Sequence, residues 1–70
     1  MKPHEQRVVD EKSALDEKLT ALVQFICESP LFESLSVREQ FLLREQRDHM
    51  RGYSDVLAMR IAGFEKDTGQ

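Results

Sequence analysis

The sequence predicts an all-α protein in which a single domain, residues 1–70, folds as an antiparallel two-helix hairpin and assembles as a homo-oligomeric bundle. Charged residues make up 33% of the chain while glycine and proline are few, a composition typical of long amphipathic helices. Two long segments carry apolar residues at spacings of three and four, and a Ser-Pro pair separates them. At 70 residues one hydrophobic core barely offsets chain entropy, so we expect self-association.

The first predicted helix covers about residues 4–28. Its apolar residues follow helical spacing and form one narrow seam, with an extra turn where Lys12 or Glu11 falls: Val8, Leu15, Leu19, Leu22 and Ile26. Acidic residues crowd its N-terminal half, where they complement the positive end of the helix dipole. The segment therefore has one face for a partner helix and a charged face for solvent.

The predicted connection covers residues 29–35. Pro30 lacks an amide proton and disfavours the helical conformation at Ser29, so the first helix must end there. Three large apolar residues follow within a few positions: Leu31, Phe32 and Leu35. They predict a short helical turn that plugs the closed end of the hairpin, with Phe32 buried.

The second predicted helix covers about residues 36–64 and begins at a capping box formed by Ser36 and Glu39. Its predicted seam runs through Leu43, Gln46, Met50, Tyr53, Leu57 and Phe64, with Ile61 beside it. We expect residues 65–70 to form a frayed tail.

The short connection makes the two helices antiparallel, which sets which residues lie level with one another. Counting outward from the connection places Ile26 near Leu43 and Leu19 near Met50. The same count places Lys12 near Tyr53 or Leu57, and Glu5 near Arg60 as a salt bridge at the open end.

Arg44, Arg47 and Arg51 are candidate ligand-binding residues. Their i, i+3, i+7 spacing puts three guanidinium groups within about 60° of arc on the helix, away from the predicted seam. Guanidinium groups bind phosphate oxygens bidentately, so this arginine row is able to clamp phosphates. The alternative is a solvated face on which the arginines pair with Glu45, Asp48 and Asp55.

Tyr53 and Lys12 form a second candidate site, where an aromatic ring on one arm meets an ammonium group on the other. Such a site would let Tyr53 stack a base while Lys12, helped by Arg7, holds a phosphate. The alternative is a core tyrosine whose hydroxyl reaches water and a lysine whose stem lies along the seam.

Several other functions are not expected. The net charge of −3 argues against general nucleic-acid binding, which depends on neutralising many phosphates. We find no motif of a nucleophile, a phosphate loop, a metal site or a cofactor, so we expect no enzyme. The single cysteine, Cys27, and the lack of a leader or membrane-spanning run favour the cytoplasm.

Two segments, PHEQRVVDEKSALDEKLTAL and EQFLLREQRDHMRGYSDVLAMRIAGF, span nearly the whole chain and resemble short bacteriophage proteins first catalogued in crAss-like phages. The most specific pieces are residues 6–12, residues 15–19 and the run from Met50 to Ile61. That group is similar in size and layout to the helical-hairpin domain of phage anti-CBASS and anti-Thoeris sponge proteins. Those proteins assemble as homo-oligomers and sequester the cyclic nucleotide signals of bacterial immunity.

The resemblance implies a phage accessory protein of the host cytoplasm that suppresses host defence by sequestering a cyclic nucleotide, without catalysis. Two alternatives stay open. The first is a protein–protein inhibitor or adaptor whose acidic first helix mimics the surface bound by a basic region of a host defence protein. The second is a dimeric four-helix bundle that grips RNA through the arginine row.

Overall fold

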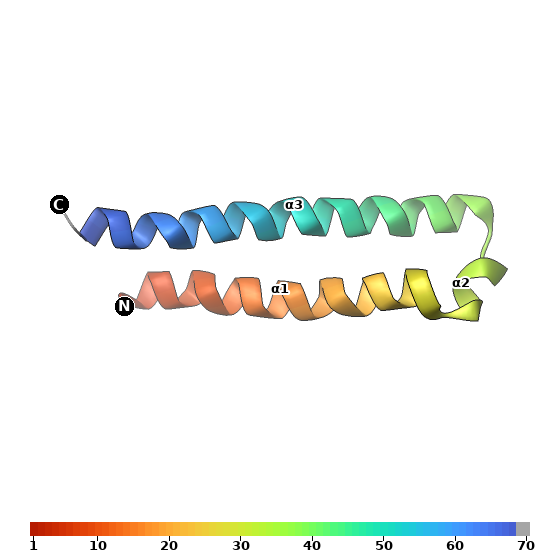
Figure 1. Ribbon diagram of the computed structural model, residues 1–70, viewed down its shortest axis with the longest axis horizontal. Coiled ribbons are helices and arrows are strands. Elements are labelled where there is room, and N and C mark those ends of the chain that lie inside the picture. Colours follow the sequence, from red (N-terminus) through yellow and green to blue (C-terminus); the bar gives the residue numbers. More distant parts are fainter. Residues whose placement is uncertain (69–70) are drawn as a thin grey trace.

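The computed structural model describes the backbone of residues 1–68 and the side chains of residues 1–64. It is an all-helical hairpin of two long helices, α1 (Pro3–Glu28) and α3 (Val37–Thr68), joined by the short helix α2 (Pro30–Ser34). The two long helices lie side by side, α2 closes one end, and both termini lie at the other (Figure 1). The molecule is a rod with extents of 53 × 15 × 15 Å.

The helix boundaries follow from local chemistry. At the start of α1 the Lys2 backbone N–H donates to Glu5 Oε1 at 2.9 Å, and Pro3 takes the first helical position, where no amide proton is needed. Ser36 Oγ accepts the backbone N–H of Glu39 at 3.1 Å, which is half of the predicted capping box. Helix α3 continues to Thr68, beyond its predicted end at residue 64, and residues 69–70 lie outside the described part.

The seam of α3 has a strict coiled-coil repeat. Between Val37 and Phe64 the shielded positions alternate at spacings of three and four, with Gly63 beside them: Gln40, Leu43, Arg47, Met50, Ser54, Leu57, Ile61 and Phe64. Leu57 is the most deeply buried residue, at 1% exposed. One half of this repeat is therefore apolar, while the other half is polar until Ile61.

This repeat corrects the predicted seam at two positions. Ser54 is 8% exposed and faces α1, whereas Tyr53 is 46% exposed and lies outside the seam. Gln46 is likewise exposed, and Arg47 takes the seam position beside it. The prediction failed at these two positions because it followed hydrophobicity, whereas the structure places the polar residues Ser54 and Arg47 in the seam.

That contact joins Ser54 Oγ, the donor, to Asp16 Oδ1 at 2.6 Å. In the antiparallel register that this contact marks, Lys12 is level with Leu57, one of its two predicted neighbours, and not with Tyr53. At the open end His4 packs edge-on against Phe64, with ring centroids 6.4 Å apart. Glu5 is buried and accepts the Lys2 amide, so the predicted salt bridge to Arg60 does not form among the described residues.

The closed end contains the apolar plug that the sequence predicts. Phe32 is 3% exposed, and its ring packs edge-on against Phe25 with centroids 6.0 Å apart. Arg44 lies over the Phe32 ring at 5.1 Å from its centroid. The side-chain amide of Gln40 donates to the Leu35 carbonyl at 3.0 Å, which ties the connection to the first turns of α3. The turn is thus held by both packing and hydrogen bonding.

Candidate functional site

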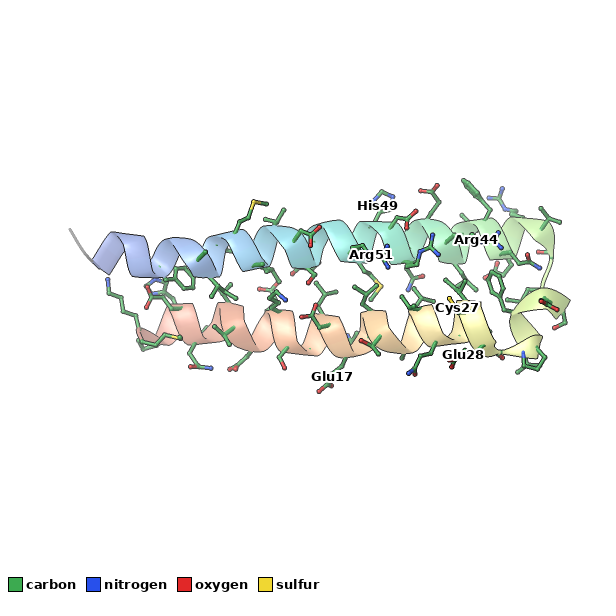
Figure 2. All side chains as sticks on the ribbon, viewed as in Figure 1. Glu17, Cys27, Glu28, Arg44, His49 and Arg51 are labelled. Atoms are coloured by element: carbon green, nitrogen blue, oxygen red, sulfur yellow. The ribbon has the colours of Figure 1, made fainter. Side chains whose placement is uncertain are left out.

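The arginine row lies along one edge of α3, where Figure 2 shows Arg44 and Arg51 on the same helix. The three residues differ in their surroundings. Arg44 is held over Phe32, and Arg47 Nε donates to Asp48 Oδ1 at 3.0 Å with its side chain 25% exposed. Arg51 is exposed and has no ion pair or aromatic partner among the residues whose side chains are described.

Arg47 therefore corrects the expectation that the whole row avoids the seam. At about 100° per residue, the row spans an arc that begins at the rim of the seam and ends on the solvent side. Of the predicted ion-pair partners Asp48 binds Arg47, while Glu45 lies 3.6 Å from His49. The solvated-face interpretation thus accounts for one of the three arginines.

Lys12 is part of a half-buried polar cluster at the edge of the contact between α1 and α3. Its Nζ donates to Asp16 Oδ2 at 2.7 Å, while the other oxygen of the same carboxylate accepts the Ser54 hydroxyl. The Lys12 ammonium, and then the Ser54 hydroxyl, hold the pKa of Asp16 below its ordinary value, because both hydrogen bonds favour the ionised carboxylate. Lys12 is thus committed to a carboxylate on its own helix.

The sequence interpretation did not foresee the contact between Asp16 and Ser54. A serine within a helix is usually solvated, and only the antiparallel register shows that this one faces Asp16. The available signal was the seven-residue repeat itself, which assigns residues 40, 47, 54 and 61 to one row of the seam.

Tyr53 lies on the other side of α3 from the arginine row. It is two residues from Arg51, which corresponds to about 160° around the helix axis. Arg7 is exposed near the open end, roughly 28 Å along the rod from the level of Arg44 at about 1.5 Å per residue. The six candidate residues therefore do not converge in one copy of the chain, and the arginine row is the cluster that does form.

Other parts of the described surface are chemically different. A shallow hollow on α1 is lined by Ser13, Asp16, Glu17 and Thr20, and its two carboxylates disfavour an anionic ligand. No three His, Cys, Asp or Glu side chains within residues 1–64 are grouped so as to hold a metal ion. None of the described helices is long and apolar enough to cross a membrane.

The fold and this surface define a small helical-hairpin protein with a cationic edge on its second long helix. A protein-family model described as Sequestin matches residues 2–63, and the chain belongs to that family. Comparisons with curated proteins and with solved structures gave no match.

Proposed function

We propose that this protein binds and sequesters an anionic cyclic nucleotide without altering it chemically, acting as a phage accessory protein against host defence. The observation that supports this proposal most is the arginine row, in which Arg44, Arg47 and Arg51 present guanidinium groups along one edge of α3. The family name, Sequestin, is in keeping with a sequestering role.

The arginine row suits a ligand with more than one phosphate group. Residues 44 and 51 are two helical turns apart, about 10 Å along the axis, so two phosphates of one ligand are able to meet different arginines. Arg51 needs no rearrangement to bind, whereas Arg47 would exchange Asp48 for the ligand. We expect Arg51 to contribute most of the affinity because it breaks no existing pair.

A complete site is proposed to form between copies of the chain. Tyr53 and the arginine row face opposite sides of α3, so a ligand held by both would contact two protomers. Arg7 and Lys12 would join such a site only from a neighbouring copy, and Lys12 would first have to leave Asp16.

Thermal unfolding in the presence of cyclic di- and trinucleotides and cyclic ADP-ribose isomers tests this proposal. A ligand that binds the folded state at a hundred times its dissociation constant adds about 2.7 kcal/mol to the free energy of unfolding, which raises the midpoint. We expect one class of compound to produce this shift. If the protein is folded and none of these compounds raises its unfolding midpoint, the proposal is contradicted.

The matched variants are Arg51→Ala and Arg38→Ala. Both remove one positive charge from α3, but Arg38 lies outside the arginine row, about 140° around the helix from Arg51. Arg51→Ala should abolish most of the ligand-induced shift while Arg38→Ala retains it. Equal losses would show a non-specific charge effect rather than a site.

A protein–protein inhibitor or adaptor is the second candidate, and the charge of α1 favours it. Six carboxylates against three cations give α1 a net charge of −3, and Glu17 points away from α3 (Figure 2). A pulldown from host lysate that recovers one stoichiometric partner, lost on Glu17→Lys, would support this function over sequestration. Steeply salt-dependent RNA binding would favour the RNA-binding bundle instead.

A further inference from the structure

The outer face of α3 carries exposed apolar side chains that the hairpin itself leaves uncovered. Tyr53, Val56 and Met59 are 46%, 50% and 66% exposed, within two turns of one another. Helix α1 presents no large apolar side chain of comparable exposure. The buried apolar core comprises Val8, Phe32 and Leu57, so the monomer gains little from its own interior.

We infer that two copies of this chain associate through the outer faces of their α3 helices, antiparallel about a two-fold axis near residues 57 and 58. The inference concerns assembly and stands independently of any ligand. Its central residues are Gly52, Val56, Met59 and Gly63, which we call the outer stripe; the first three are exposed and Gly63 is half-buried. This stripe lies on the side of α3 away from the seam, since the mean directions of the two sets of residues are about 150° apart around the helix axis.

The outer stripe reads the same in both directions. Its spacings are four, three and four, so an antiparallel copy places Gly52 level with the partner's Gly63 and Val56 level with the partner's Met59. A two-fold interface requires this self-complementarity, because the same patch must serve both copies.

The glycines fit this arrangement and have no role inside the monomer. Neither Gly52 nor Gly63 has a positive φ, and a Cβ added at either position would meet nothing within 4 Å. Glycine is among the least favourable residues in a helix interior, so its presence needs a compensating contact. Close approach of a second backbone at both ends of the stripe supplies one.

Electrostatic complementarity supports a second copy as the occupant. On one flank of the stripe the antiparallel register brings Tyr53 within two residues of the level of the partner's Arg60, and the symmetry repeats the pair. A guanidinium group over a tyrosine ring is favourable. On the other flank Asp55 is two residues from the level of the partner's Ala62, and the two Asp55 residues stay about 8 Å apart along the axis.

Analytical ultracentrifugation over a concentration series, with Cys27 kept reduced, tests the interface. We expect a monomer–dimer equilibrium that Val56→Lys weakens by about tenfold or more, because it buries an unpaired charge twice per dimer. Glu17→Lys, on the outer face of α1, should leave the equilibrium unchanged. A monomer at all concentrations, or equal dissociation constants for wild type and Val56→Lys, would overturn the inference.

The Gly52→Ala variant tests whether Gly52 lies in a close contact between two α3 helices or has no part in association. The variant should raise the unfolding midpoint of the monomer at low concentration, because alanine favours helix, and yet weaken the dimer several-fold. Stronger or unchanged association would contradict close approach at this position.

Engineered cysteines test the register in a Cys27→Ser background. Oxidising a mixture of Val56→Cys and Met59→Cys proteins should give mainly the mixed disulfide dimer, since those two positions are level across the axis. A preference for either like pair would refute the stated register. A dimer that binds no cyclic nucleotide, or a monomer that does, would separate this inference from the proposed function.

Discussion

The two faces of α3 differ in which residues they expose: polar residues are shielded on the inner face, and apolar residues are exposed on the outer face. On the inner face Gln40 and Arg47 are half-buried, and Ser54 is 8% exposed. On the outer face Val56 and Met59 are at least half exposed. The inner face thus follows the apolar residues Leu43, Met50 and Leu57, and the polar Ser54 shares this face because its hydroxyl donates to Asp16.

The comparison also shows what each face is suited to do. The inner face joins α1 to α3 through the Lys12, Asp16 and Ser54 cluster, which specifies one alignment among several that similar apolar seams would allow. The outer face has large apolar side chains that residues 1–64 leave exposed. The inner face therefore determines how α1 and α3 pack, whereas the outer face is available to a second copy of the chain.

The largest expected difference between the two faces is in the stability lost when an apolar side chain is shortened to alanine. Leu57→Ala should lower the free energy of unfolding by about 2 to 5 kcal/mol, because it leaves a cavity in the best-packed part of the seam. Val56→Ala, one residue away on the outer face, should change it by less than about 0.5 kcal/mol at monomer concentrations. Urea denaturation measures both, and similar losses would show that Val56 is packed within the monomer.

A smaller effect is expected from the polar contact of the inner face. Ser54→Ala should lower the free energy of unfolding by about 1 kcal/mol, since Asp16 loses a short hydrogen bond. Ser13→Ala on α1 is the matched control, because it makes the same change in helix propensity at an exposed residue. If both variants behave alike in thermal unfolding, the contact does not stabilise the hairpin.

Between the two faces, the arginine row should divide into structural and free members. Arg44→Ala should lower the free energy of unfolding by about 0.5 to 1 kcal/mol through loss of its contact with the Phe32 ring. Arg51→Ala should leave the stability nearly unchanged. Chemical denaturation of both variants checks this, and an equal loss in each would contradict the division.

The smallest expected effect is a pH dependence from Asp16. Its pKa is lowered in the folded protein, so the stabilisation is complete above the unfolded value of about 3.9 and is lost as pH falls from there through the folded pKa. Thermal midpoints measured between pH 7 and pH 2 should fall less steeply for Asp16→Asn than for wild type in that acidic range. Parallel curves would show that Asp16 contributes no pH dependence.

The sequence predicted the hairpin because its boundaries rest on local chemistry. Pro30 ends the first helix, Ser36 caps the last, and Phe32 is the buried plug that three apolar residues in a short connection indicated. Each of these features depends on neighbours close in the chain. The near-continuous helical spacing of α1 and α3 then left an antiparallel pair as the simple arrangement.

The inward side of α3 was harder to predict, because this helix carries apolar residues on both faces. Choosing Tyr53 over Ser54 follows hydrophobicity, yet the larger residue is the exposed one. The partner of Ser54 lies 38 residues away in the sequence, and no local pattern signals it. For the candidate site, spacing predicted the arginine row, but placing Tyr53 beside Lys12 depended on assigning Tyr53, in place of Ser54, to the seam.

Equilibrium dialysis followed by mass spectrometry tests sequestration most directly. The protein is dialysed against a candidate cyclic nucleotide, and the bound ligand is then released by heat. Its concentration and molecular mass are measured on both sides of the dialysis membrane. The proposed function predicts enrichment on the protein side, recovery of the ligand with unchanged mass, and loss of enrichment in Arg51→Ala but not in Arg38→Ala. Equal concentrations on both sides for every compound tested, or a ligand of altered mass, would contradict it.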